Sequence, residues 1–211
     1  MRKMGLLSVG VALLLAVAVE PAQADLSACV ATVGFDEDAN LERGMGFGVR
    51  WGRSTGIIGG ETSLLIAFPE RELAYPGVGA NVVTSSETAK ALFYEGRFML
   101  SVPVGQIRPF VGVGLGAVTI LSTDVPSTGD ATLDNALDAV AGLQTSTSVS
   151  YGGGAHYALS DRFSLRLDLR QYLVLSVKGL AASQAASQVG LEADDETVQY
   201  TEMSLGVNVA F

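Results

Sequence analysis

The chain has 211 residues, 48% of them hydrophobic, with 13 basic and 22 acidic residues and a mean hydropathy of +0.36. The length suits one domain, and a net charge of −9 argues against binding to nucleic acid or docking onto anionic lipid, both of which attract basic faces. The single cysteine, Cys29, excludes a disulfide framework within the chain.

The N-terminus has the pattern of a secretory signal peptide. Two basic residues precede an apolar run over 5–19, and Ala22-Gln23-Ala24 supplies the small residues of a cleavage site. We expect cleavage after Ala24, which gives a signal peptide over residues 1–24 and a mature domain over residues 25–211. The removed segment contains Arg2, Lys3 and Glu20, so 11 basic and 21 acidic residues remain, a formal charge of −10.

Two other readings of this region stay open. The segment would act as an uncleaved anchor if it spanned a membrane, but its apolar run is short for that purpose. Leu26-Ser27-Ala28-Cys29 resembles the lipobox of bacterial lipoproteins, in which the cysteine is acylated. Glu20, Pro21 and Asp25 separate it from the apolar run, whereas lipoboxes usually abut that run.

The first half of the mature domain contains four segments in which apolar and polar residues alternate, as the two faces of a β-strand require. Gly44–Trp51 is the sharpest, with Met45, Phe47, Val49 and Trp51 on one face. Leu65 is an exception, because it interrupts the polar face of its segment. The predicted strands are Cys29–Phe35, Gly44–Trp51, Glu61–Phe68 and Leu92–Val102, and the long connections between them are Asp36–Arg43 and Pro69–Lys90.

Four more strands follow. In the clearest, beginning at Phe163, four large apolar residues alternate with Ser164, Arg166, Asp168 and Arg170. The others are a strand beginning at Arg108, Val149–Leu159 and Gln199–Phe211. Tight turns at 103–106 and 160–162 alternate with long connections at Leu121–Thr145 and Ser176–Glu196, and we expect a short amphipathic helix at Thr132–Leu143 within the first of these.

Eight strands with this rhythm predict an all-β fold, an eight-stranded antiparallel up-and-down barrel with both chain ends on the same side. Tilted strands of about nine to eleven residues span a bilayer. A soluble barrel of the lipocalin type also alternates, with its apolar face inside. Here the polar face is rich in glycine, which weakens a solvent-facing strand, and the apolar face carries aromatic residues that suit lipid. We therefore expect a transmembrane β-barrel with long external loops. The glycines are Gly46, Gly48, Gly112, Gly114, Gly116, Gly152, Gly154 and Gly206. The aromatic residues are Trp51, Tyr94, Phe98, Tyr151, Tyr157, Phe163 and Phe211.

Two motifs resemble those of a known family of membrane barrels. Arg108-Pro109-Phe110-Val111-Gly112-Val113-Gly114-Leu115-Gly116 resembles the turn and strand of the small OmpA-like outer-membrane β-barrel family, and Met203–Phe211 resembles the C-terminal targeting strand of such proteins. The resemblance covers the barrel only, since we find no counterpart of the peptidoglycan-binding domain that follows it in OmpA.

The resemblance implies a location in the outer membrane of a Gram-negative bacterium, surrounded by outer-membrane lipid, and a monomeric state. It also implies that periplasmic chaperones and the barrel assembly machinery act during biogenesis. The assembly signal carried over to this chain comprises Leu205, Gly206, Val207, Val209 and Phe211.

The charged residues on the polar face should point into the barrel. Four are basic and four acidic, so their charges cancel: Arg50, Glu61, Glu95, Arg97, Arg166, Asp168, Arg170 and Glu202. Buried charge is costly unless it is paired, and an eight-stranded barrel is only wide enough for its own side chains. This pattern favours a plug that holds the barrel together; the alternative is a narrow conducting path. Charge reversal of Arg166 or Asp168 should therefore destabilise the fold.

The sequence offers little for catalysis or metal binding. Some outer-membrane enzymes use a histidine with a serine and an acid, and in the lipid A deacylase family the histidine lies two residues before the serine. His156-Tyr157-Ala158 lacks that serine, so we expect an inward, structural His156. Asp194-Asp195-Glu196 lacks the ligand spacing of a calcium loop. We expect no catalytic residue, metal or cofactor.

Three functions compete. The first is a non-enzymatic barrel with a structural or surface-interaction role carried by its external loops, because loops on rigid scaffolds carry specificity. The second is a narrow transport barrel for small or apolar solutes, like OmpW. The third is a lipid-modifying enzyme that uses His156.

Overall fold

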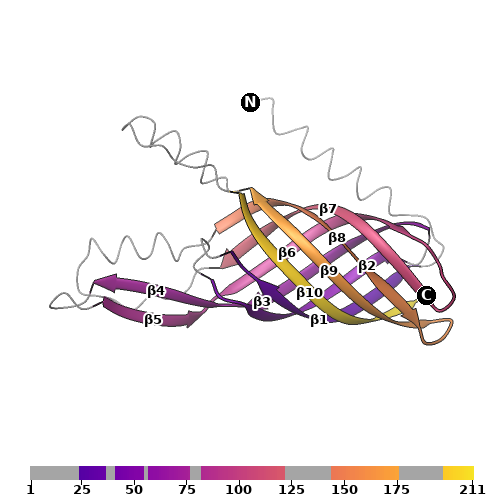
Figure 1. Ribbon diagram of the computed structural model, residues 1–211, viewed down its shortest axis with the longest axis horizontal. Coiled ribbons are helices and arrows are strands. Elements are labelled where there is room, and N and C mark those ends of the chain that lie inside the picture. The colour runs from indigo at the N-terminus through magenta and orange to yellow at the C-terminus, as the bar shows by residue number, and fades with distance from the viewer. Residues whose placement is uncertain (1–23, 37–40, 55–56, 77–81, 122–143, 176–196) are drawn as a thin grey trace, which may run out of the picture.

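The computed structural model is a closed antiparallel barrel of eight strands, with a two-stranded hairpin projecting from one end (Figure 1). It describes residues 24–36, 41–54, 57–76, 82–121, 144–175 and 197–211, and side chains within these ranges other than those of 72–85. The order around the barrel is β1-β10-β9-β8-β7-β6-β3-β2, so strands adjacent in sequence pair, apart from the inserted hairpin. The first and last strands, β1 and β10, close the barrel. The predicted eight-stranded up-and-down architecture is confirmed.

The barrel strands match the predicted ones in place and exceed most of them in length. They are β1 (Asp25–Gly34), β2 (Gly44–Arg53), β3 (Ile58–Phe68), β6 (Lys90–Ser101), β7 (Ile107–Leu121), β8 (Gln144–Ala158), β9 (Phe163–Leu175) and β10 (Thr197–Ala210). The strand predicted at Cys29–Phe35 begins four residues earlier, because Asp25 to Ala28 pair with both β2 and β10. The helix expected at Thr132–Leu143 lies outside the described residues.

Short turns join the strands at one end of the barrel, which we call the turn end, and both β1 and β10 have a terminus there. The other end, which we call the loop end, carries the long connections. Among the described residues no helix is long and apolar enough to cross a membrane.

Pro69–Lys90 was expected only as a connection, but most of it forms the hairpin of β4 (Glu70–Pro76) and β5 (Val82–Thr88), and Lys90 begins β6. Its register continues that of the barrel, because Ala67 pairs with Ala91 in β3 and β6, and Glu70 pairs with Thr88 in the hairpin. Pro69, which has no N–H, interrupts the ladder, while the Ala89 N–H donates to its carbonyl at 2.8 Å. The sequence concealed these strands because polar and apolar residues do not alternate along them.

The outer wall of the barrel is apolar. All seven aromatic residues assigned to this face lie on it, from Tyr157, 44% exposed, to Phe211, 73% exposed. Leu165, Leu167 and Leu169 also point outward. Since β9 keeps strict alternation, its Arg166, Asp168 and Arg170 point inward.

The interior has an apolar layer toward the loop end and an ionic layer beside it. The apolar layer contains Leu65, which explains why this residue breaks the polar phase of its strand: it points inward and packs in an apolar cluster. The other buried members are Ala31, Val33, Leu41, Ala67, Ala89, Ala91, Phe93, Val118, Ile120, Tyr172, Val174 and Tyr200.

Candidate functional site

The ionic layer is built from side chains that meet across the barrel. Strands β9 and β3 are not neighbours in the sheet, yet Arg166 of β9 binds Glu61 of β3 through both guanidinium Nη atoms, at 2.6 and 2.9 Å. Arg170 also reaches Glu61, at 2.8 Å. Such two-pronged guanidinium–carboxylate contacts combine strength with fixed geometry, so they join opposite walls of the barrel.

Asp168 lies at the centre of the layer. Its Oδ2 accepts from Arg166 at 2.6 Å and from Arg170 at 2.8 Å, and Arg97 donates to both of its carboxylate oxygens at 3.1 Å. Arg50 approaches the same carboxylate at 3.7 Å. Four guanidinium groups therefore surround one carboxylate whose residue is 0% exposed.

Glu95 and Glu202 complete the layer. Glu95 accepts from Arg170 and from the Ser150 hydroxyl. Glu202 accepts from Arg50 at 2.6 Å and from the Tyr172 hydroxyl at 2.7 Å, which links the ionic layer to the apolar one. All eight charged residues assigned to the interior are at most 5% exposed, and each contacts an opposite charge. The four basic and four acidic groups thus form one neutral network.

The glycines of β7 provide the space that this network occupies. A Cβ added to Gly114 would lie 2.5 Å from the Ser150 hydroxyl oxygen and 2.7 Å from Glu95 Oε2, and one on Gly112 would lie 2.6 Å from Arg97 Nε. Charged side chains from the neighbouring wall therefore lie directly over the glycine backbone.

His156 lies nearer the turn end, 4% exposed, with its ring centroid 5.1 Å from that of Phe110. The Arg166 guanidinium covers the same phenyl ring at 4.8 Å, within the range of a cation–π contact. Neither ring nitrogen of His156 has a hydrogen-bond partner within the described residues. A nucleophile needs a base within hydrogen-bond reach, and the described contacts of His156 include no such pairing.

Other polar atoms near the turn end also lack hydrogen-bond partners within the described residues, among them Asp25 Oδ1, Ser27 Oγ and Asn208 Oδ1. Among all the described residues, no group of three or more histidine, cysteine or carboxylate side chains is arranged to hold a metal ion. Asp194-Asp195-Glu196 lies outside the described residues.

Toward the loop end, aromatic rings pack against one another inside the barrel. Phe93 packs on Tyr172 with ring centroids 5.1 Å apart, and Phe35 packs on Tyr200 at 4.8 Å. Sequence reasoning missed this layer. Leu65 and Phe93 are large apolar residues in the inward phase of their strands and could have indicated this layer. So few exceptions to an alternating pattern do not by themselves predict a layer.

The base of the hairpin closes over this layer. Arg71 is buried and forms an isolated bridge with Leu41, and the Glu42 N–H donates to the Glu70 carbonyl at 2.8 Å. Burial lowers the pKa of the Arg71 guanidinium from its ordinary value, and its interaction with Tyr200 acts in the opposite direction.

The predicted assembly signal follows the alternation of β10. Leu205, Val207 and Phe211 are exposed on the outer wall, Gly206 points inward, and Val209 is half-buried. The Phe211 N–H donates to the Ala24 carbonyl at 3.0 Å. Cys29 lies within β1, and its thiol donates to the Gly48 carbonyl at 3.6 Å. A chain beginning at an acylated Cys29 would lack the Asp25 to Ala28 part of this ladder.

Solved structures are similar to this chain, and the first of those described here shows the same fold. Neisserial surface protein A matches with a TM-score of 0.53 and 13% identity, covering 90% of this chain and 96% of that one. The N-terminal β-barrel domain of Pseudomonas aeruginosa OprF matches with a TM-score of 0.43 and 16% identity, over 89% and 97%. The outer membrane enzyme PagL matches with a TM-score of 0.41 and 16% identity, over 88% and 98%. No curated protein matches the sequence.

A shared fold does not assign a function, but the family match is more direct. The model of the outer membrane protein beta-barrel domain matches residues 5–211, almost the whole chain. The closed eight-stranded barrel, its apolar outer wall and this match agree: the chain belongs to the outer membrane β-barrel family, and its location is the outer membrane of a Gram-negative bacterium.

Proposed function

We propose that this chain is a non-enzymatic surface-interaction protein that uses a rigid, closed barrel to present its loop end outside the cell. The β4–β5 hairpin carries the proposal. It extends the register of β3 and β6 beyond the barrel, so its position is set by the barrel wall. A binding element held in this way loses little conformational entropy when it engages a partner.

The edges of the hairpin suggest how it binds. The hairpin is a separate two-stranded sheet, and a strand edge presents backbone N–H and C=O groups that an extended segment of another protein can pair with. Residues 41 and 42 occupy the base of the β4 edge through the contacts of Leu41 and Glu42. The edge of β5, Val82–Thr88, is therefore the proposed docking edge, and the partner is an extended polypeptide.

The interior argues against the two alternatives. A transport path would have to cross both the ionic layer around Asp168 and the aromatic layer around Phe93, and each is packed. An enzyme built on His156 would need a hydrogen-bonded partner for the ring. We therefore infer a closed lumen. We also propose, as the family resemblance implies, a monomer that is inserted by the barrel assembly machinery with the help of periplasmic chaperones after signal-peptide removal.

The test replaces residues 70–88 with a two-residue Asn-Gly turn, which suits an antiparallel hairpin. Cells of a non-adherent Gram-negative strain that display the wild type should bind immobilised extracellular-matrix proteins, and cells that display the shortened barrel should not. A second variant, Thr84→Pro in β5, leaves the loop length unchanged and removes one backbone donor of the proposed docking edge, so it should also weaken adhesion. Equal adhesion by wild-type and shortened barrels of equal surface yield would refute the proposal.

A further inference from the structure

The imidazole of His156 is a buried polar group that the ionic layer does not use. The side chain points inward, is 4% exposed, and has no hydrogen-bond partner for either ring nitrogen within the described residues. Buried polar groups in folded proteins are nearly always hydrogen-bonded, so each exception calls for an explanation. His156 is also the single histidine of the chain, and histidine is the side chain that ordinarily changes its charge near neutral pH.

Arginines surround this ring. The residues paired with His156 in the sheet are Arg108 of β7 and Arg166 of β9, and paired residues on one face have Cβ atoms about 4.5–5.5 Å apart. Arg97 of β6 approaches from another side, since its guanidinium carbon lies 5.8 Å from the centroid of the Phe110 ring on which His156 packs. A second proton on the imidazole would therefore add a positive charge among three existing ones.

The carboxylates whose charge acts on His156 are Glu61 of β3 and Asp168 of β9, and both are already engaged. Both oxygens of Glu61 accept hydrogen bonds from arginine guanidinium groups, and so do both oxygens of Asp168. A charged imidazole would thus have to displace an arginine from the ionic layer to gain an acceptor there. Water is the acceptor that it could reach without breaking that layer.

The strand that carries His156 is weak beside it. Gly152, Gly153 and Gly154 are consecutive in β8, and glycine in a strand interior lowers stability because it has no side chain to pack. The Phe110 ring lies over Gly154, where an added Cβ would come within 2.8 Å of the ring Cζ. The ring that supports His156 therefore rests on bare backbone, and this part of β8 is where the wall can yield.

We propose that His156 makes the turn end of the barrel acid-sensitive. At neutral pH the uncharged ring packs on Phe110 and the turn end of the lumen is closed. In mild acid the ring takes up a proton from water, leaves Phe110 because of the arginine charges around it, and residues 152–158 of β8 open to water. At neutral pH the proton returns to water and the wall closes again.

The direction and size of the pH dependence follow from proton linkage. The open state binds one proton more than the closed state, so opening becomes more favourable as the pH falls. A histidine exposed to water titrates near pH 6.5, so the opening constant should rise about tenfold for each pH unit below that value. Carboxylates exposed to water titrate at about pH 4, so the range from about pH 6.5 to 5 reports mainly on His156.

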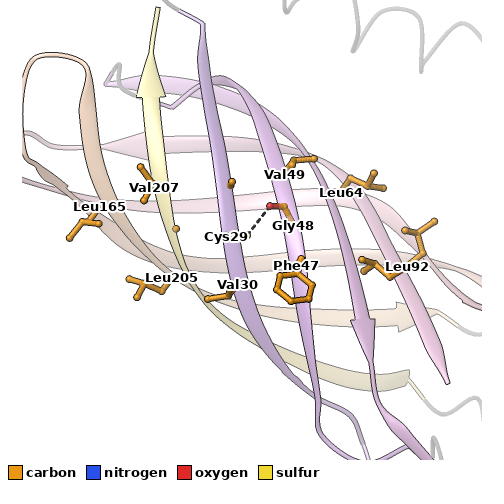
Figure 2. A pocket seen from close by; sticks show the side chains of 13 residues that line it. Cys29, Val30, Phe47, Gly48, Val49, Leu64, Leu92, Leu165, Leu205 and Val207 are labelled. Carbon is orange, nitrogen blue, oxygen red and sulfur yellow. Dashed lines mark hydrogen bonds between the residues drawn. The ribbon is translucent and has the colours of Figure 1, made fainter. Parts of the chain in front are cut away.

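The test measures amide hydrogen exchange by mass spectrometry on the barrel in detergent micelles, corrected for the intrinsic pH dependence of exchange. Protection of residues 152–158 should fall about tenfold per pH unit below about 6.5 and recover on return to neutral pH. The internal reference is β2, which lies opposite β8 in the ring of strands and also contains glycines. Its Gly48 carbonyl accepts from the Cys29 thiol, as Figure 2 shows, and its protection should not change.

His156→Phe is the matched variant, because it keeps an aromatic ring beside Phe110 and cannot take up a proton. Its protection at residues 152–158 should be independent of pH over the same range. His156→Gln, which is also uncharged, provides the same comparison if the phenylalanine variant does not fold, as judged by heat-modifiable gel mobility. Three results would overturn the inference: unchanged protection in the wild type, an equal acid-dependent loss in the uncharged variant, or an equal loss at β2.

Discussion

At the scale of single residues, the interior combines two opposite choices of side chain. Arginines from β9 extend across the lumen, and glycines on β7 leave the room that Glu95 and Arg97 occupy. Either choice alone would fail: long side chains without glycines would overpack the barrel, and glycines without long side chains would leave cavities. The sequence shows both, because charge and glycine recur in the same phase of the alternation.

The central carboxylate gives the sharpest prediction at this scale. Asp168→Asn removes the charge on which Arg97, Arg166 and Arg170 converge, leaving uncompensated positive charge in the interior. Removing one partner of a buried ion pair typically costs about 3–5 kcal/mol. We expect a loss of that size in the free energy of unfolding, measured by urea titration of the barrel in detergent micelles.

Asp161→Asn, in the exposed turn before β9, is the control and should change stability by about 0.5 kcal/mol or less. Charge reversal at Asp168 or Arg166 should be more harmful than neutralisation. Equal unfolding midpoints for the two asparagine variants would contradict the role given to the network.

At the scale of elements, how well the sequence predicts a strand depends on whether the strand has two unlike faces. The barrel strands separate lipid from lumen, so alternation reveals them. Polar and apolar residues do not alternate along the hairpin strands β4 and β5, whose register follows from that of β3 and β6. Strand ends were also misjudged: β1 begins at Asp25, where it pairs with both neighbours, although Asp25 to Ala28 already alternate in the phase of the strand.

The last strand carries the prediction at this scale. Deletion of Phe211 should reduce the yield of folded barrel in the outer membrane, because the resemblance makes this residue part of the assembly signal. Heat-modifiable gel mobility of outer-membrane fractions measures that yield. Phe163→Ala removes a comparable outward aromatic residue from the turn end of β9 and should leave assembly near normal. Undiminished yield without Phe211 would remove the basis for the assembly signal.

At the scale of the whole molecule, the sequence predicted the ionic layer but not the aromatic one, and the two together determine what the lumen can do. An ion-paired layer alone leaves a polar route along its side chains. The proposal of a closed lumen rests on the rings of Phe93, Tyr172 and Tyr200, which pack together beside the ionic layer. The reason for the omission is geometric: a pattern of two faces shows which residues point inward, but not the height at which those residues meet.

We therefore expect no steady conductance when the wild type is reconstituted in planar bilayers. A general porin inserted by the same procedure provides the positive control. Blocking substitutions at Gly114 are uninformative for this purpose, because a Cβ there already meets Ser150 and Glu95. A steady current proportional to salt concentration would contradict the closed lumen and favour transport.

The shared register of hairpin and barrel has a mechanical consequence. A partner that pulls on the tip of β4 and β5 along their axis pulls β3 and β6 lengthwise against β2 and β7, their neighbours in the wall. Antiparallel hydrogen bonds run across the strands, so such a load shears many of them together and does not peel them one by one. If the proposed docking at the hairpin occurs, the barrel would resist tension applied through it along the strand axis.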